Sequence, residues 1–158
     1  MQAKIETVKT LLDALPFIKE FRKEIVVIKY GGSAQSSPEL KEKFAEDILL
    51  MYLVGIKPVI VHGGGKKITD MLDALKIATE FIEGQRVTTE DTMRIVEMIL
   101  SGEINKEIAS LLNSHGAKAI GISGKDAHFI KAKPKDFGKW GFTGNITEVK
   151  EEVVLNLI

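Results

Sequence analysis

Two segments of the sequence each place a short apolar run directly before glycines. The first, EIVVIKYGG, covers residues 24–32, and the second, KPVIVHGGG, covers residues 57–65. A β-branched run that ends in glycines is typical of a buried strand entering a tight loop, and apolar residues recur at helical spacing after each run. Alternating strands and helices form mainly parallel sheets with right-handed crossovers. The sequence therefore predicts an α/β fold, with an open, mainly parallel twisted sheet flanked by helices.

Weaker patterns predict the remaining elements. Residues 3–22 predict an amphipathic helix that kinks or breaks at Pro16, because proline removes a backbone donor. Further helices are expected over 38–54, from Gly65 onward, over 89–101 and over 103–114, with Ser101-Gly102 separating the last two. AKAIGIS, residues 117–123, predicts a third buried strand. HFIKAK and FTGNITEV, residues 128–133 and 142–149, predict a small antiparallel ribbon.

Charge and composition exclude several classes of protein. Lysine and arginine number 22, as do aspartate and glutamate, so no net field attracts nucleic acid or a membrane surface. No apolar run reaches the roughly 18 residues of a membrane span. The N-terminus shows no signal-peptide pattern, and the chain contains no cysteine. The sequence thus predicts a cytoplasmic protein without nucleic-acid or membrane partners.

The two glycine clusters, Gly31-Gly32 and Gly63-Gly64-Gly65, each follow a predicted strand. In open α/β sheets, ligands bind at the carboxyl ends of the strands. Glycine turns that lead into helices leave backbone N–H groups accessible, which favours phosphate or carboxylate. Lys29, two residues before the first cluster, adds positive charge on the same strand. Each cluster alone is more often a simple tight connection, and a strand lysine is usually only solvated, but together they indicate an anion site.

Arg86 stands just before a predicted helix start. Thr88, followed by Asp91 three residues later, has the spacing of a capping box. An arginine beside a helix N-terminus can offer its planar fork to a carboxylate, and the helix end adds partial positive charge. The alternative is a surface arginine paired with a glutamate, and the sequence leaves both open.

Other catalytic patterns are missing from the sequence. A P-loop ending at Gly124-Lys125 would need glycine at 119 and serine or threonine at 126, where the chain has Ala119 and Asp126. No G-x-G-x-x-G occurs, and the three histidines lack ligand-like spacing, so no metal site is predicted. No serine or threonine has an evident base partner for a nucleophile triad.

Five motifs together resemble one family. In order, the chain contains VIKYGGSA, VGIKPVIVHGGG, GQRVTTEDTMRIVEMILSGEINKEI, GISGKD and GFTGNITEV. Their order and spacing resemble the N-acetylglutamate kinases of the amino acid kinase family. The resemblance implies transfer of the γ-phosphoryl group of ATP to the side-chain carboxylate of N-acetyl-L-glutamate, in arginine biosynthesis. Phosphoryl transfer needs alignment and charge neutralisation rather than a general base, which agrees with the missing catalytic patterns.

The resemblance also implies residue roles. Lys29 would stabilise the transferring phosphoryl group as a catalytic residue. Gly31 and Gly32 would contact the phosphates of ATP, with Mg²⁺ held mainly through ATP. Gly64 and Gly65 would line the acetylglutamate site, and Arg86 would hold the α-carboxylate of the substrate.

Residues 1–22 resemble the N-terminal helix of the hexameric branch that L-arginine inhibits, where such helices join dimers. We therefore expect an oligomerisation helix over 1–22 and an amino-acid-binding lobe over 23–158, in a homo-oligomer that is a dimer or a hexamer. Family members run to nearly twice this length. We expect the nucleotide-binding lobe, with its second catalytic lysine, to be absent from this chain, which would be inactive alone.

Two alternatives stay open. One is a kinase for another acyl amino acid, such as an aminoadipate derivative, with the same lobe and a different side-chain pocket. The other is a non-catalytic module that senses an anion or arginine through the same glycine turns. The sequence also departs from the family pattern at Gln35, where an apolar residue is usual.

Overall fold

The computed structural model describes residues 2–35, 37–136 and 139–158. Its helices are α1 (Gln2–Phe21), α2 (Pro38–Leu53), α3 (Gly65–Ala74), α4 (Glu90–Glu97), α5 (Asn105–Ser114) and α6 (Glu152–Leu155), with 3₁₀ turns η1 (Gly32–Gln35) and η3 (Asp126–His128) and a π-helical segment, η2 (Met98–Ile104). Its strands are β1 (Ile25–Tyr30), β2 (Lys57–His62), β3 (Phe81–Ile82), β4 (Gln85–Arg86), β5 (Ile130–Pro134) and β6 (Gly144–Val149). The predicted α/β class is confirmed.

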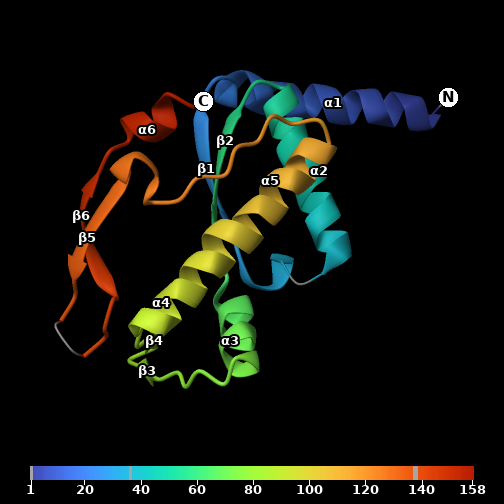
Figure 1. Cartoon of the computed structure of the whole chain (residues 1–158). Helices are drawn as coiled ribbons and strands as arrows, with labels where there is room; N and C mark the ends of the chain where they lie inside the picture. Colours follow the sequence, from blue (N-terminus) through green and yellow to red (C-terminus); the bar gives the residue numbers. More distant parts are fainter. Residues whose placement is uncertain (1, 36, 137–138) are drawn as a thin grey trace.

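The parallel pair β1–β2 has α2 and α5 beside it, and α4 lies beyond the carboxyl ends of the strands, near α3 and the β3–β4 hairpin (Figure 1). The pairing sets Val27 opposite Val59 and Lys29 opposite Val61. The connecting helix α2 begins where the sequence predicts, because the hydroxyl oxygen of Ser37 accepts from the Leu40 N–H and Pro38 occupies the first turn. This strand–helix–strand unit brings the carboxyl ends of both strands to one edge.

The hydrophobic core lies between the β1–β2 pair and the helices on one of its faces. The buried apolar residues come from β1 and from the helical segments α2, α3, α4, η2 and α5: Tyr30, Ala45, Ile48, Ile68, Leu72, Ile95, Ile99, Ile104, Ile108 and Leu112. Tyr30 stacks on Phe44 of α2, with ring centroids 3.8 Å apart. Side chains alternate along a strand, so Val27 and Val61 lie on the opposite face, where they are 66% and 52% exposed.

The prediction of a third strand over 117–123 is wrong for this structure, where the segment is irregular. A strand requires a backbone ladder with a neighbour, and several backbone groups of this segment bond instead to side chains of α5. Asn113 binds both the N–H and the carbonyl of Ala119, and the Asn105 amide donates to the Ile122 carbonyl at 3.2 Å. Ile120 is 73% exposed, so the segment is not buried as predicted.

The predicted break at Ser101-Gly102 is also wrong. Residues 90–114 form one helical run, in which η2 carries Ser101 and Gly102 as a π-helical segment. A helical glycine costs only about 1 kcal/mol relative to alanine, and burial of Ile99 and Ile104 on either side anchors the wider turn. Ile104, the last residue of η2, packs against Gly64 in the loop after β2.

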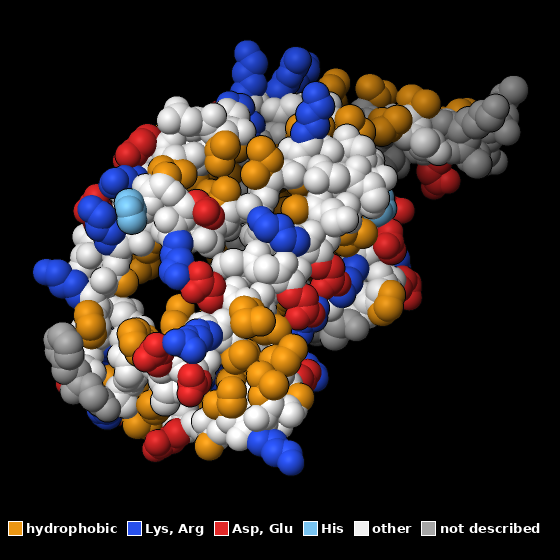
Figure 2. Space-filling model, viewed as in Figure 1, with side chains coloured by type: hydrophobic (Ala, Val, Ile, Leu, Met, Phe, Trp, Pro, Cys, Tyr) orange, Lys and Arg blue, Asp and Glu red, His pale blue; other side chains and the backbone are white. Residues whose placement is uncertain are grey.

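Helix α1 continues through Pro16, so the predicted break there is not found. An internal proline can bend a helix without ending it, and Ala14, Leu15 and Lys19 nearby are strong helix formers. The helix projects from the body of the molecule (Figure 1), and apolar side chains follow it in Figure 2. Within the described ranges, no helix combines the length and apolarity needed to cross a membrane. The division at residue 22 stays a prediction.

Two antiparallel pairs complete the structure. The predicted ribbon is confirmed as β5 paired with β6. A second hairpin, β3–β4, was not predicted, because each of its strands has only two residues. Its turn residues Glu83 and Gly84 both have positive φ, at 52° and 76°, as a type I′ hairpin turn requires. This hairpin carries Arg86.

Candidate functional site

The structure brings the two glycine clusters together. Tyr30 and His62, the last residues of β1 and β2, are paired in the sheet, and the Gly63 N–H donates to the Tyr30 carbonyl at 3.4 Å. The two glycine turns, which start at Gly31 and Gly63, therefore lie at the same edge of the sheet. This arrangement of the strand ends is the one that the sequence predicts.

The first cluster forms a tight turn with open surroundings. Gly32 has φ +56°, in the left-handed region that favours glycine, and begins η1. A Cβ added at Gly31 would meet no atom within 4 Å. The backbone here is therefore accessible to a ligand, and contact with ATP phosphates stays a prediction.

The second cluster shows two different uses of glycine. A Cβ at Gly64 would lie 2.3 Å from Ile104 Cδ1 and 2.8 Å from Leu100 Cδ2, so Gly64 lets the start of α3 pack against η2. Gly65 has open space around it and begins α3, which has no side-chain cap. The first N–H groups of α3 are consequently available to an anion. Substrate contact by Gly64 and Gly65 stays a prediction.

Arg86 extends from β4 to the first turns of α3. Its Nη2 donates to the Thr69 hydroxyl at 2.8 Å, and that hydroxyl donates to the Gly65 carbonyl at 3.0 Å. The guanidinium lies over the Phe81 ring, 4.6 Å from its centroid. Nη1 is buried and has no hydrogen-bond partner among the described residues. Arg86 is therefore not a surface arginine paired with a glutamate, and the structure links it to Gly65.

Lys29 lies on β1 on the face opposite Tyr30, where its side chain is exposed. Within the described ranges, its ammonium group has no ionic or hydrogen-bonding partner. The structure places it one strand position before Tyr30, near the strand end, but does not bring it into contact with Arg86. Its role in phosphoryl transfer stays a prediction.

The sequence marks Gln35 only as a departure from the family pattern, and the structure places its side chain at this edge. Its Nε2 donates to the carbonyls of Tyr30, at 3.0 Å, and Gly63, at 3.5 Å. It therefore bridges the ends of both strands beneath the glycine turns. These two hydrogen bonds give the polar residue that departs from the family pattern a structural role at this edge.

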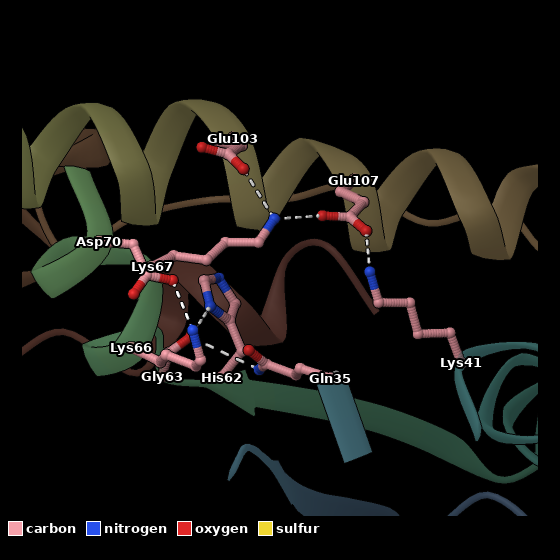
Figure 3. Close-up of polar contacts among 9 residues, drawn as sticks. All are labelled: Gln35, Lys41, His62, Gly63, Lys66, Lys67, Asp70, Glu103 and Glu107. Atoms are coloured by element: carbon pink, nitrogen blue, oxygen red, sulfur yellow. Dashed lines mark hydrogen bonds and ion pairs between the residues drawn. The ribbon is translucent and has the colours of Figure 1, made fainter. Parts of the chain in front are cut away.

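A charged cluster of Lys41, Lys67, Glu103 and Glu107 lies next to this edge (Figure 3). Lys67 Nζ binds Glu103 at 2.7 Å and Glu107 at 2.8 Å, and Lys41 binds the other oxygen of Glu107. The cluster joins α2, α3, η2 and the first turn of α5. A small pocket lies against it, lined by Tyr30, Gln35, Lys41, Lys67, Ile104, Glu107, Ile108 and Leu111.

The cluster shifts three ionisation equilibria. Hydrogen bonds from Lys41 and Lys67 lower the pKa of Glu107 below its ordinary value. Hydrogen bonds to Glu103 and Glu107 raise the pKa of Lys67. Burial, and then the charge of Glu107, raises the pKa of the Tyr30 hydroxyl. The first two shifts favour the charged forms of Glu107 and Lys67. The third favours the neutral form of Tyr30.

Replacing Glu107 with glutamine should lower the free energy of unfolding by about 1 kcal/mol at pH 7, because two partly exposed ion pairs are lost. The folded-state pKa of Glu107 is depressed, so its contribution is present above the ordinary glutamate pKa and is lost as pH falls through the lowered value. Urea titrations at pH 7 and pH 3 should show the difference shrinking in acid. Asp70→Asn, which removes an exposed helix pair with Lys66, is the control and should change little. A Glu107→Gln effect that persists undiminished at pH 3 would contradict this account.

Two of the three histidine side chains, His62 and His115, have local partners. A ring nitrogen of His62 lies 3.1 Å from the Gly63 carbonyl, and His115 lies 3.1 Å from a Glu42 oxygen. No group of three or more acidic, histidine or cysteine side chains that could hold a metal occurs among the described residues.

Together, the adjoining glycine turns, the uncapped start of α3 and the buried Nη1 donor of Arg86 form the architecture of a domain that can bind anionic small molecules. The chain belongs to the amino acid kinase family, whose pattern matches residues 24–158.

Named relatives are similar over the whole chain. It is 80% identical to the acetylglutamate kinase of Sulfurimonas denitrificans and 71% identical to that of a Nitratiruptor species, each over 158 residues. The alignments cover 100% of this chain and 56% of each relative. The chain therefore spans about half the length of the curated relatives it matches.

Solved structures share the fold. Smu.665 of Streptococcus mutans UA159 has a TM-score of 0.76 and 29% identity, over 85% of this chain and 54% of that one. N-acetylglutamate synthase of Neisseria gonorrhoeae, solved with coenzyme A and N-acetyl-glutamate, has a TM-score of 0.71 and 21% identity, over 95% of this chain and 34% of that one. At 21% identity, the similarity to the synthase concerns the fold alone.

Proposed function

We propose that this chain is the acetylglutamate-binding part of an acetylglutamate kinase, an enzyme of arginine biosynthesis. The enzyme would transfer the γ-phosphoryl group of ATP to the side-chain carboxylate of N-acetyl-L-glutamate. The names of the relatives support this activity, and membership of the amino acid kinase family supports the use of ATP.

The observation that supports the substrate most directly is the buried Nη1 of Arg86. It has no acceptor among the described residues, and a buried charged donor without a partner is costly. A carboxylate beside Nη1 would accept a charge-assisted hydrogen bond and would gain from the partial positive charge at the start of α3. The α-carboxylate of N-acetyl-L-glutamate has this chemistry. Arg86 is linked through the Thr69 hydroxyl to Gly65, where an added Cβ would meet no atom within 4 Å.

The turn after β1 fits the phosphates of ATP. Gly31 has open space in place of a side chain, and Gly32 holds the backbone in a conformation that favours glycine. Successive backbone N–H groups in such a turn can bind phosphate oxygens. Mg²⁺, held mainly through ATP, would neutralise charge on the transferring group.

The chemistry needs no general base, because the attacking carboxylate is already ionised at neutral pH. Its oxygen would attack the γ-phosphorus in line, and the new O–P bond would form as the bond to the β,γ-bridging oxygen breaks. ADP would leave with the bonding electron pair. Lys29 would donate to the phosphoryl oxygens, where charge must be stabilised in the transition state. The adenine pocket and a second lysine would come from the part of the relatives that this chain does not match.

ATP-dependent formation of an acyl phosphate, trapped with hydroxylamine, tests the proposal in the full-length protein. We expect product with N-acetyl-L-glutamate and none when ATP is omitted. Faster turnover of N-acetyl-L-2-aminoadipate would instead identify a kinase for the longer acyl amino acid. Binding of acetylglutamate or arginine without turnover would identify a non-catalytic binding module.

We also propose that α1 joins copies of the protein into an assembly that L-arginine inhibits. The helix exposes Ile5, Val8, Leu11, Leu12, Leu15 and Phe17, each by 40% or more, and such apolar surface favours association. Deleting residues 1–22 should convert a hexamer into dimers and abolish arginine inhibition, while turnover persists. Light scattering and arginine titration measure the two effects, and an unchanged hexamer would contradict the proposal. The cytoplasmic location stays a prediction.

A further inference from the structure

The β3–β4 hairpin that carries Arg86 is too small to be stable by itself. Its register contains two residue pairs, Phe81 with Arg86 and Ile82 with Gln85, and isolated two-stranded hairpins are marginal at best in water. Glu83, a residue other than glycine, has φ 52° in the turn, which adds strain. The position of Arg86 must therefore depend on contacts from outside the hairpin.

Those contacts come from residues 139–143, here called the Trp140 turn, which connects toward β6. Trp140 is only 6% exposed, and its indole N–H points to the Ile82 carbonyl at 3.5 Å. Lys139 Nζ lies 4.2 Å from the centre of the Trp140 ring and 3.4 Å from a Glu83 oxygen. Nearby Lys135 likewise lies over the ring and binds Gln85 at 2.8 Å. Both strands of the hairpin and its turn are therefore in contact with Lys135, Lys139 or Trp140.

The backbones of the two segments are also in direct contact. The Thr88 N–H donates to the Trp140 carbonyl at 3.1 Å, and the Phe142 N–H donates to the Thr88 carbonyl at 2.8 Å. A Cβ at Gly141 would lie 2.1 Å from the Thr88 carbonyl oxygen, and Gly141 has φ +61°. A side chain there is therefore incompatible with this approach.

Two hydroxyl groups connect the Trp140 turn to the backbone of Arg86. The Thr143 hydroxyl lies 3.1 Å and the Thr88 hydroxyl 3.2 Å from the Arg86 carbonyl, and the hydroxyls lie 3.3 Å from each other. Thr143 is 57 residues away from Arg86 in the chain. A hydrogen bond to this carbonyl restricts the backbone from which the guanidinium extends to Thr69.

We propose that Thr143, supported by the Trp140 turn, is a positioning residue that fixes the backbone of Arg86 so that Nη1 faces a carboxylate ligand. The inference rests on the proposed function for the identity of that ligand, the α-carboxylate of N-acetyl-L-glutamate. The hydrogen bonds of the Thr143 hydroxyl go to the Arg86 carbonyl and the Thr88 hydroxyl, so Thr143 acts on Arg86 through its backbone. Its effect should therefore be confined to ligands that carry the α-carboxylate.

Calorimetry on the full-length protein tests this with two ligands, N-acetyl-L-glutamate and 4-acetamidobutyrate, which lacks only the α-carboxylate. Thr143→Val should weaken acetylglutamate binding about 5-fold, the usual effect of one lost hydrogen bond, with 4-acetamidobutyrate binding unchanged. Thr143→Ser, which keeps the hydroxyl, should restore the affinity. Thr147→Val is the matched control, since Thr147 donates to the Lys131 carbonyl in the same ribbon, and it should change neither affinity.

A second measurement does not depend on the ligand. Hydrogen exchange of peptides covering 81–88 should become faster in Thr143→Val and stay normal in Thr147→Val. Unchanged exchange, or equal weakening of both ligands, would overturn the role of Thr143. If the unmodified protein did not prefer acetylglutamate to 4-acetamidobutyrate, the proposed function of Arg86 would fail, and faster exchange in Thr143→Val would then show a purely structural contact.

Discussion

Replacing Lys29 with arginine should lower kcat about 100-fold or more in the full-length protein, the usual cost of losing one donor to the charge that develops in the transition state. This corresponds to about 2.7 kcal/mol of transition-state stabilisation. Arginine keeps the positive charge, but its planar fork cannot occupy the place of a compact ammonium. Because Lys29 is exposed and lacks partners within the described ranges, the substitution should not disturb the fold.

The binding of N-acetyl-L-glutamate should change little in the same variant, so the loss should appear in kcat rather than in KM. Lys57→Arg provides a matched control. Lys57 is an exposed strand lysine at the opposite end of the parallel pair, where it lies across from Ile25. A Lys29→Arg enzyme with nearly normal kcat would remove Lys29 from the reaction, whatever its position on β1.

The elements that the sequence predicts correctly are those whose formation depends on residues close together in the chain. The β-branched run before Gly31 forms β1, and the Ser37-Pro38 pair starts α2, because strand and cap preferences act within a few residues. Parallel pairing then places Gly31 and Gly63 at one edge. The candidate anion site could be located from these elements alone.

The features that the sequence did not predict depend on contacts between distant residues. Lys41 meets Glu107 across 66 positions, and Lys139 meets Glu83 across 56. The segment 117–123 has the composition of a buried strand, yet its backbone bonds to side chains of α5. Composition gives the tendency to form a strand, whereas the presence of a neighbouring ladder decides the outcome.

Gly64 and Gly102 show the same limit for glycine. The sequence indicates only that side chains are absent at these positions. At Gly64 the structure shows the reason, which is the approach of Ile104 and Leu100 from η2. At Gly102 a helix break was predicted, and the π-helical segment continues instead because its buried isoleucines pack into the core.

Arg86→Lys should weaken the binding of N-acetyl-L-glutamate about 10- to 100-fold, since charge-assisted hydrogen bonds contribute about 1.5–3 kcal/mol each. A lysine ammonium can reach toward the same place, but it cannot bind Thr69 through one nitrogen and a carboxylate through another. The affinity for 4-acetamidobutyrate should stay nearly constant, because that ligand lacks the α-carboxylate. Calorimetry with both ligands therefore separates a lost contact from a damaged fold.

Arg94→Lys is the matched control, because Arg94 is an exposed arginine on α4 whose partner is Glu90 one turn away. It should leave both affinities unchanged. Equal weakening of both ligands by Arg86→Lys would assign Arg86 to the packing of the hairpin on α3. An unchanged preference for acetylglutamate would show that the carboxylate binds elsewhere. A selective loss would explain why Arg86 is held over Phe81 with a buried Nη1 that is unpaired among the described residues: the missing acceptor arrives with the substrate.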